Sequence, residues 1–276
     1  MVHDNRPVGI FDSGIGGLTV TQAIRQALPM ERLLYFGDTI HMPYGQRSLA
    51  EVRNFSMAIT DALLRQDCKL IVVACNTASG AALRQLREHW PHIPFVGMEP
   101  AIKPAAEYTR SGVVGVIATA ATFQTEVYAS VVERFGKDVR VMHQACPGLV
   151  SAIEAGDLDG PVTEGLLRSW LEPMLREGID ALVLGCTHYP LVRPLIERIV
   201  GPEVRVIDPA PAVARQVARL LEQKNLASHP EQHGELICHT SGAPTVFAAL
   251  LERMGLCGIP VLPSTWSTNG VLELID

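Results

Sequence analysis

The sequence predicts an α/β protein made of two parallel-sheet lobes with a ligand-binding cleft between them. Short runs of apolar, often β-branched residues alternate with longer amphipathic stretches along the whole chain. Continuously apolar strands separated by helices are typical of a parallel sheet that helices cover on both faces. About nine such strand–helix units are more than one sheet comfortably holds, so we expect two lobes.

Each expected strand is a short run in which nearly every residue is apolar, as burial on both faces requires. In chain order the runs are Val8–Phe11, Leu33–Phe36, Leu70–Ala74, Phe95–Met98, Val113–Ala118, Val139–Met142, Ala181–Leu184, Val204–Ile207 and Leu236–His239. The longer stretches between them mix apolar and polar residues and are typical of helices with one buried face. Among these are Leu18–Leu28, Leu49–Arg65, Ala81–His89, Thr122–Phe135 and Ala210–Gln223.

Two of the expected strand ends are alike. Cys75 and Cys186 each follow an apolar strand, precede a helix and are followed by hydroxyl or amide side chains. The two positions are about one lobe apart, which supports two similar lobes. Ligands of open α/β sheets bind at the carboxyl ends of the strands, so facing lobes would place one thiol on each wall of a cleft. Pro100 and Pro209 are the expected crossing points between the lobes.

Composition excludes several classes of protein. Hydrophobic residues make up 47% of the 276 residues and charged residues 19%, which excludes a disordered chain. The 23 glycines and 19 prolines form no repeat, which excludes a collagen-like protein. The formal net charge of −6, without basic runs, predicts no nucleic-acid partner and no membrane-surface binding.

The N-terminal segment 1–20 has no long apolar run and contains Asp4, Arg6 and Asp12, so we expect no secretory signal and a cytoplasmic protein. No apolar run elsewhere is long enough to span a bilayer. In a reducing cytoplasm the six cysteines should be free thiols rather than disulfides. Four of them are expected to be small buried hydrophobic residues, namely Cys68, Cys146, Cys238 and Cys257.

The remaining two cysteines, Cys75 and Cys186, carry the expected chemistry. A helix start favours the thiolate form of a cysteine through its free N–H groups and its dipole. A thiol–disulfide oxidoreductase would need Cys-x-x-Cys spacing, which is absent, and a cysteine hydrolase would leave the second thiol unexplained. A racemase without cofactor uses both groups, because one removes the α-proton and the other delivers a proton to the opposite face.

Two loops add further candidates. The Gly9–Leu18 segment lacks the third glycine of a dinucleotide fingerprint, and it also lacks the lysine of a phosphate-binding loop. Its glycines serve either close packing or a site in which Asp12 and Ser13 meet a proton or an ammonium group. Pro43–Gly45 predicts a rigid turn that presents backbone N–H groups to a carboxylate. Zinc-type cysteine and histidine spacings are absent, so we expect no metal.

Five segments, taken together and in this order, resemble bacterial glutamate racemases over nearly the whole chain. They are Gly9–Val20, Tyr35–Thr39, Pro43–Gly45, Ala74–Ala78 and Gly185–Pro190. The Phe–Asp–Ser–Gly and Cys–Thr–His–Tyr–Pro stretches separate this family from the related aspartate and hydantoin racemases. The resemblance implies two pseudo-symmetric flavodoxin-like lobes, the first built from residues 1–98 plus 208–276 and the second from residues 99–207.

The resemblance also implies a cofactor-independent interconversion of L- and D-glutamate, which supplies D-glutamate for peptidoglycan and so serves cell wall biogenesis and cell shape. It implies that Cys75 deprotonates D-glutamate and Cys186 L-glutamate, that Asp12 and His188 assist them, and that Glu154 is a supporting acid. The positions that match substrate-binding residues are Asp12, Ser13, Pro43, Tyr44, Gly45, Asn76, Thr77, Thr119, Thr122, Thr187 and His188.

Two stretches depart from the family pattern. Ile117–Phe123, which holds Thr119 and Thr122, matches less closely, and Gly148 and Ser151 replace other residues before Glu154. Two alternatives stay open: a racemase or decarboxylase of the same superfamily that acts on another acid such as aspartate, and an amino-acid-binding module without catalysis. The family resemblance allows a homodimer and regulation by a cell-wall precursor.

Overall fold

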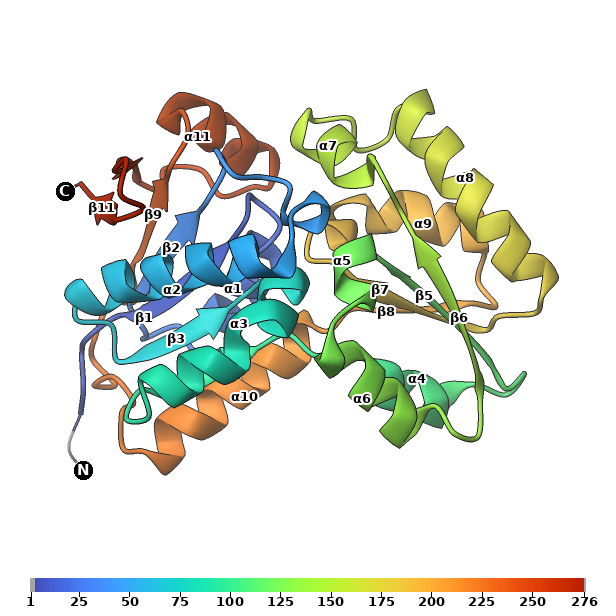
Figure 1. The fold of residues 1–276 in the computed structure, drawn as a ribbon, viewed down its shortest axis with the longest axis horizontal. Coiled ribbons are helices and arrows are strands. Elements are labelled where there is room, and N and C mark those ends of the chain that lie inside the picture. Colours follow the sequence, from blue (N-terminus) through green and yellow to red (C-terminus); the bar gives the residue numbers. More distant parts are fainter. Residues whose placement is uncertain (1–2, 276) are drawn as a thin grey trace.

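Two sheets organise the chain, and each forms the centre of one lobe (Figure 1). The computed structural model describes residues 3–275. The larger sheet has seven strands in the order β11-β10-β9-β2-β1-β3-β4, and the smaller sheet has four in the order β6-β5-β7-β8. All neighbouring strands are parallel except β10 and β11, which form an antiparallel pair.

The strands are β1 (Val8–Asp12), β2 (Leu33–Gly37), β3 (Leu70–Val73), β4 (Phe95–Gly97), β5 (Val113–Ala118), β6 (Arg140–Ala145), β7 (Ala181–Gly185), β8 (Arg205–Ile207), β9 (Leu236–Thr240), β10 (Val261–Trp266) and β11 (Leu272–Leu274). The α-helices are α1 (Leu18–Ala27), α2 (Leu49–Arg65), α3 (Asn76–His89), α4 (Ile102–Tyr108), α5 (Ala120–Phe123), α6 (Glu126–Phe135), α7 (Leu149–Glu154), α8 (Pro161–Arg176), α9 (Arg193–Val200), α10 (Ala210–Gln223) and α11 (Pro244–Arg253). Two 3₁₀ turns complete the described elements, η1 (Tyr44–Gln46) and η2 (Tyr189–Val192).

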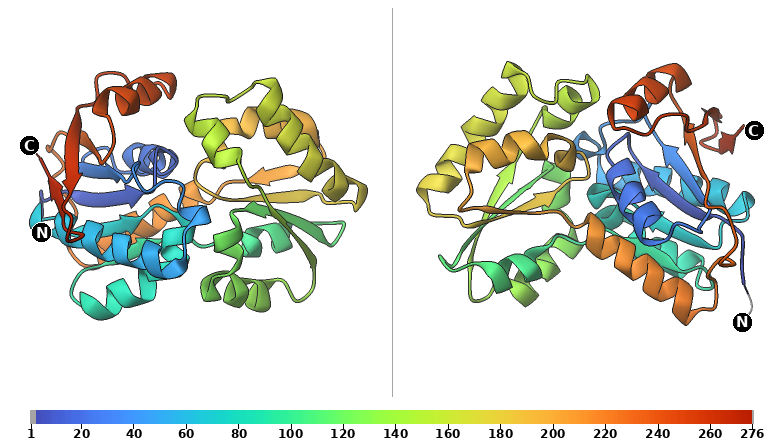
Figure 2. Two further views of the ribbon diagram at one scale, coloured as in Figure 1. Left: turned by 45° about the horizontal axis from the view of Figure 1, so that its top comes forward. Right: turned by 180° about the vertical axis from the view of Figure 1, so that it is seen from behind.

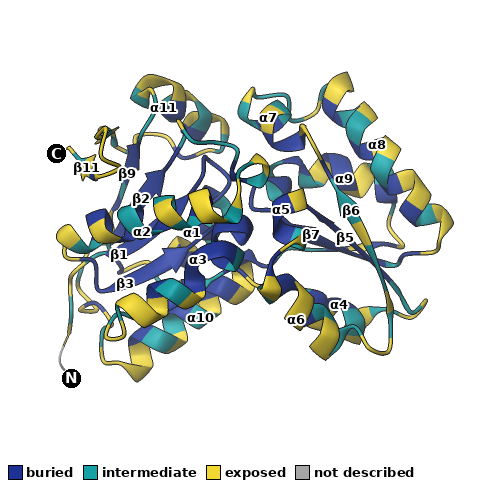
Figure 3. Ribbon diagram, in the orientation of Figure 1, coloured by how far each residue is buried: buried dark blue, intermediate teal, exposed yellow. Residues whose placement is uncertain are grey.

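The central strands of the first lobe are buried on both faces (Figure 3). Along β1, Ile10 packs into the core on one face and Phe11 into the core on the other, because alternate residues of a strand point to opposite faces. Helices α1, α10 and α11 cover the first face, and α2 and α3 cover the second. Burial on both faces explains why these strands are continuously apolar.

The second lobe is built in the same way around β5 and β7. Helices α7, α8 and α9 cover one face of its sheet, and α4 and α6 cover the other. Strand β6 forms an edge and has no fully buried residue. The two lobes stand beside each other in every view (Figure 2).

The two sheets share a strand order that fixes where a ligand can bind. The order β2-β1-β3-β4 in the first sheet corresponds to β6-β5-β7-β8 in the second. In this flavodoxin-like order the chain turns in opposite directions after the two central strands, which leaves a crevice at their carboxyl ends. In the first lobe that crevice lies beyond β1 and β3, and in the second beyond β5 and β7.

The chain crosses between the lobes twice. It leaves the first sheet after β4 and enters the second lobe at α4, and it returns between β8 and α10. Pro100 and Pro209 lie in these two crossings. We propose domain boundaries that match these crossings, with residues 1–98 plus 208–276 in the first lobe and 99–207 in the second.

All nine expected strands are present, with ends shifted by a few residues, but the expectation missed β10 and β11. Strand β10 has Pro263 in its middle and mostly exposed or partly exposed residues, so it lacks a continuous apolar run. The single helix expected over Thr122–Phe135 is wrong. The chain forms α5 and α6 instead, because Thr125 caps a new helix by accepting a hydrogen bond from the N–H of Tyr128 at 3.2 Å.

Three further observations concern residues 3–275. None of their helices combines the length and apolar character that a membrane span needs. No three His, Cys, Asp or Glu side chains in this range are grouped so that they could hold a metal ion. The six cysteines, all within it, are unpaired; the burial expected of Cys257 is wrong, because this residue is exposed in the loop after α11.

Candidate active site

The ends of β1, β3, β5 and β7 enclose a small cavity between the lobes. Its volume is about 20 Å³, roughly the room that one water molecule needs. The residues that line it come from both lobes: Asp12, Ser13, Pro43, Tyr44, Gly45, Cys75, Asn76, Thr77, Thr119, Thr122, Val150, Cys186, Thr187 and His188. The cavity therefore exists only because the two lobes meet.

Cys75 lies on the first-lobe side of the cavity, at the start of α3. Its thiol is buried beside the carboxylate of Asp12. Burial, followed by the negative charge of Asp12, raises the pKa of Cys75 well above its ordinary value. Before substrate binds, Cys75 is therefore a protonated thiol that can donate a proton.

Asp12 ends β1 and is fully buried. Its Oδ1 accepts a hydrogen bond from the N–H of Ser13 at 2.7 Å, and its Oδ2 accepts from the N–H of Gly17 at 2.6 Å. The hydroxyl of Thr187, from the second lobe, donates to Oδ2 at 3.1 Å. Burial raises the pKa of Asp12, although the charge of His188 and these hydrogen bonds oppose the rise.

Cys186 follows β7 on the second-lobe side and has its own partner. Its Sγ lies 3.9 Å from Nδ1 of His188, and Nε2 of His188 lies 2.7 Å from Oε1 of Glu154. Burial opposes a charge on His188, but the hydrogen bonds to Cys186 and Glu154 outweigh it and raise the pKa of His188 well above its ordinary value. His188 is therefore the group on this side of the cavity that can exchange a proton with Cys186.

The glycine-rich turn after β1 lets His188 and Glu154 of the second lobe approach the first lobe closely. A Cβ atom added at Gly16 would lie 2.5 Å from Nδ1 of His188, and one at Gly14 would overlap Oε1 of Glu154. The N–H of Ile15, between the two glycines, donates to Oε1 of Glu154 at 2.9 Å. The glycines therefore serve close packing, but against the histidine–glutamate pair of the opposite lobe.

Three threonine hydroxyls form a triangle on the cavity wall. Thr77 Oγ1 lies 3.0 Å from Thr119 Oγ1 and 3.1 Å from Thr122 Oγ1, and the latter two are 2.9 Å apart. Beside them, the buried side-chain amide of Asn76 has no hydrogen-bond partner at either its oxygen or its nitrogen. An unpaired buried amide is costly, so Asn76 is well placed to bind a polar ligand.

Tyr44 and Gly45 of η1 line the cavity, but neither offers a free polar side-chain group to it. Tyr44 lines the cavity, but its hydroxyl donates to Oδ2 of Asp38 at 2.7 Å and is not free for a ligand. A Cβ atom at Gly45 would lie 2.6 Å from Cβ of Thr119, so this glycine permits close contact with the second lobe. The ring of Tyr44 and the backbone at Gly45 are what this turn offers to a ligand.

The structure brings together every residue that the sequence predicts for the site except one. Glu154 does not line the cavity; it lies behind His188, where it holds the imidazole. The sequence missed Val150, which lines the cavity from α7. Nothing in the pattern around Val150 distinguishes it from an ordinary core residue.

The cavity wall contains no lysine or arginine. An anionic ligand would therefore meet the N-terminus of α3, backbone N–H groups and neutral donors such as Ser13 and Thr187, a set that can hold carboxylates without a cation. Two thiols on different lobes, each beside an acid or a base, can exchange protons with one carbon atom. Two similar lobes with such a site between them define a two-lobed racemase.

Comparison with known proteins identifies the family. The family model described as Asp/Glu/Hydantoin racemase matches residues 8–217. A glutamate racemase of Pseudomonas paraeruginosa is 50% identical over 277 residues, which cover 100% of both chains. The crystal structure of a glutamate racemase isoform from Bacillus anthracis superposes with a TM-score of 0.86 at 34% identity, covering 94% of this chain and 97% of the other.

A third relative was solved with ligands. The structure of Escherichia coli glutamate racemase in complex with L-glutamate and the activator UDP-MurNAc-Ala has a TM-score of 0.82 at 32% identity, and it covers 98% of this chain and 100% of the other. This chain belongs to the Asp/Glu/hydantoin racemase family.

Proposed function

We propose that this protein interconverts L- and D-glutamate without a cofactor and supplies D-glutamate for peptidoglycan synthesis. The observation that carries the proposal is the pair of thiols, Cys75 and Cys186, at equivalent strand ends of two similar lobes on one cavity. The choice of glutamate is supported by relatives about half identical over the whole chain that are named glutamate racemases. A cytoplasmic location fits this role and the six free thiols.

In the direction from L to D, Cys186 starts as the thiolate and Cys75 as the thiol. Cys186 takes the α-proton of L-glutamate, and the carbanion that forms takes a proton from Cys75 on the opposite face. The products are D-glutamate, a Cys186 thiol and a Cys75 thiolate, so the protons balance and the enzyme is left ready for the reverse reaction. The substrate ammonium group stays charged and offsets part of the carbanion charge.

The neighbouring groups set these starting states. His188, held by Glu154, lies next to Cys186 and is placed to exchange a proton with it, whereas burial and the charge of Asp12 keep the proton on Cys75. For the reverse direction Cys75 passes its proton to Asp12, which the raised pKa of Asp12 makes easier, and His188 passes a proton to Cys186, so that a Cys75 thiolate and a Cys186 thiol face D-glutamate. The two sides of the cavity thus use an imidazole and a carboxylate for the same task.

Binding is assigned to the neutral donors of the cavity. Asn76 supplies an unpaired amide, and Ser13, Thr77 and Thr187 supply hydroxyls, so the two substrate carboxylates are held by hydrogen bonds rather than by ion pairs. A cavity of about 20 Å³ is too small for glutamate. The lobes must therefore part to admit substrate, which breaks contacts such as the one between Thr187 and Asp12.

The first test follows purified protein with L-glutamate and no added cofactor by polarimetry, in deuterated water. Racemisation should bring solvent deuterium to Cα, which also excludes a module that only binds amino acids. Aspartate is the comparison substrate for the alternative of a racemase or decarboxylase that acts on another acid. Turnover of aspartate but not glutamate would refute the proposed substrate.

The second test separates the two thiols with serine variants. Cys75→Ser and Cys186→Ser should lose racemisation by several orders of magnitude, because a hydroxyl is a far weaker base. On a β-chloro amino acid, which needs one deprotonation to lose chloride, Cys75→Ser should still act on the L-enantiomer and Cys186→Ser on the D-enantiomer. Cys257→Ser, in an exposed cysteine, is the matched control. The same enantiomer preference in both active-site variants would refute the assignment.

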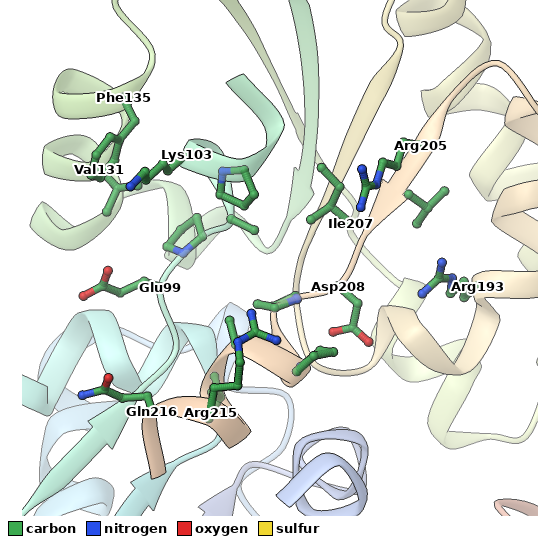
Figure 4. Close-up of a pocket in the computed structure, with 18 of the residues that line it drawn as sticks. Glu99, Lys103, Val131, Phe135, Arg193, Arg205, Ile207, Asp208, Arg215 and Gln216 are labelled. Carbon is green, nitrogen blue, oxygen red and sulfur yellow. The ribbon is translucent and has the colours of Figure 1, made fainter. Parts of the chain in front are cut away.

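Regulation by a cell-wall precursor is the second part of the proposal. A cleft of about 1370 Å³ lies along the two segments that cross between the lobes (Figure 4). Among the residues that line it, Lys103, Arg193, Arg205 and Arg215 are cationic, and Asp208 lies close to Arg193 (Figure 4). An anionic ligand here would bridge both lobes and bias their separation, which the proposed catalytic cycle requires.

The test adds UDP-MurNAc-Ala, described as an activator of the Escherichia coli relative, to the racemisation assay. Activation that Arg215→Ala weakens, at unchanged basal rate, would support a site in this cleft; no response to the compound would refute this regulation. A homodimer stays a prediction, to be measured by analytical ultracentrifugation.

A further inference from the structure

The carboxylate of Asp38, which the proposed mechanism does not use, contacts polar atoms of four other side chains. It is fully buried directly after β2 and does not line the cavity. Oδ2 accepts from the hydroxyl of Tyr44 at 2.7 Å and contacts Nδ1 of His41 at 2.9 Å. Oδ1 accepts from the hydroxyl of Ser241 and from the indole N–H of Trp266, both at 2.9 Å.

These partners come from two distant parts of the chain. Tyr44 and His41 belong to the segment between β2 and α2, whereas Ser241 follows β9 and Trp266 ends β10. The latter two lie outside residues 8–217, which the family model matches. A further link joins the same segments, because the hydroxyls of Thr39 and Thr240 are 2.9 Å apart.

Aromatic packing reinforces the connection. The ring of His41 stacks on Phe55 at 4.0 Å between centroids, and Trp266 meets His41 edge-on at 5.0 Å and Phe55 at 5.9 Å. Tyr44 lies 5.8 Å from Phe55. The four rings form one cluster between β10, α2 and η1, and all of them except Phe55 contact the carboxylate of Asp38 through a polar atom.

The other side of η1 faces the cavity and the second lobe. Tyr44 and Gly45 line the cavity, and Gly45 packs so closely on Thr119 that a Cβ atom would not fit. The turn is therefore fixed between Thr119 on one side and Asp38 on the other. A change in the hydrogen bonds to Asp38 would move the part of the turn that meets substrate.

We propose that the C-terminal strand β10 belongs to the substrate-binding apparatus, with Trp266 acting through Asp38 as a positioning residue for the turn Tyr44–Gln46. The proposal rests on the proposed function, because the turn is taken to bind glutamate. Loss of the indole N–H removes one neutral donor from a buried carboxylate, and the remaining donors redistribute. Because the hydroxyl of Tyr44 donates to the same carboxylate, we expect Tyr44 to shift when the hydrogen bond from Trp266 is lost.

The kinetic test compares Trp266→Phe with Trp170→Phe, the same change in a partly buried residue of the second-lobe core. Trp266→Phe should raise KM about fivefold to tenfold for both enantiomers, with kcat largely kept. This is less than the direct loss of a hydrogen bond to a charged group would cost, because the remaining donors to Asp38 redistribute. Trp170→Phe should leave both constants unchanged. A purely structural role would lower the thermal midpoint of Trp266→Phe and leave KM alone, which overturns the proposal.

A double-mutant cycle tests the link to Tyr44. Tyr44→Phe alone should also raise KM, and its combination with Trp266→Phe should raise KM by less than the product of the two factors, because both act through Asp38. Independent, multiplying effects would contradict the proposed link. Ser241→Ala gives a milder loss of a donor to the same carboxylate if Trp266→Phe does not fold.

A spectroscopic test does not depend on activity. The chain has three tryptophans, so Trp90→Phe and Trp170→Phe leave Trp266 as the only indole fluorophore. In that background Tyr44→Phe should shift the emission of Trp266, and Tyr108→Phe, in an exposed tyrosine of the second lobe, should not. Unchanged emission would refute the connection between Trp266 and Tyr44 through Asp38. If the wild type does not racemise glutamate, the proposed function fails, but the emission measurement still tests this connection.

Discussion

Gly16→Ala should disable one half of the site while it leaves the other half working. The added Cβ atom would lie 2.5 Å from Nδ1 of His188 and 2.8 Å from two further ring atoms. Ordinary contacts require well over 3 Å, so the imidazole must move by about 1 Å, and a displacement of that size at a catalytic group costs about 100-fold in rate. Gly16 is not among the glycines with a positive φ, so its backbone is open to alanine and overpacking is the cause of the effect.

Racemisation alone cannot reveal which side is damaged, because each turnover uses both thiols. The assay is therefore elimination from the two enantiomers of a β-chloro amino acid, measured as pyruvate release. We expect about 100-fold slower elimination from the L-enantiomer, which depends on Cys186 and His188, and a nearly unchanged rate with the D-enantiomer. Overpacking should also cost about 1–3 kcal/mol of stability, so the thermal midpoint should fall by several degrees.

Gly165→Ala is the matched control for this prediction. Gly165 lies within α8, and a Cβ atom there would meet no other atom within 4 Å. The substitution should leave both elimination rates unchanged and stabilise the helix by about 0.5–1 kcal/mol. Equal losses with both enantiomers in Gly16→Ala would refute the reasoning, since they would show that the turn does not act on the His188 side alone.

Three further predictions concern the cavity wall. Asn76→Ala should raise the transition-state free energy by about 1.5–3 kcal/mol, the value of a hydrogen bond to a charged group, and so lower kcat/KM. An unchanged kcat/KM would show that Asn76 does not bind the substrate. Val150→Ala should enlarge the cavity and improve the relative kcat/KM of glutamate analogues with an added methyl group, and a ratio equal to that of the wild type would sink the idea. Burial raises the pKa of Asp12, so the carboxylate is lost at a higher pH than in an exposed aspartate, and elimination from the D-enantiomer should fall on the acidic side as pH drops through that raised pKa. A pH–rate series with Asp12→Asn should lack this limb, whereas persistence of the limb in the variant would assign it to another group.

The architecture was largely predictable because its signals are local. A strand buried on both faces must be apolar throughout, so runs such as Val113–Ala118 stand out from the helices around them. Strand β10, which lies between β9 and the short edge strand β11, is mostly exposed or partly exposed and has no such requirement, and it was missed for that reason. The break between α5 and α6 was also missed, because the capping hydroxyl of Thr125 is hard to distinguish from a helical threonine in the sequence.

The candidate site was likewise predictable in part. The sequence by itself predicted which residues would gather at the site, because cysteines at strand ends and a family-like order of motifs are properties of the chain. Only the tertiary structure decided how they are connected. It placed Glu154 behind His188 rather than in the cavity, aimed the hydroxyl of Tyr44 at Asp38 and added Val150 to the wall. The contact of Glu154 with His188 joins two segments of the second lobe that are 34 residues apart. The direction of the Tyr44 hydroxyl is set by packing within the first lobe, and Val150 reaches the cavity wall only where the two lobes meet. All three depend on how elements pack in space, which a local sequence pattern does not encode.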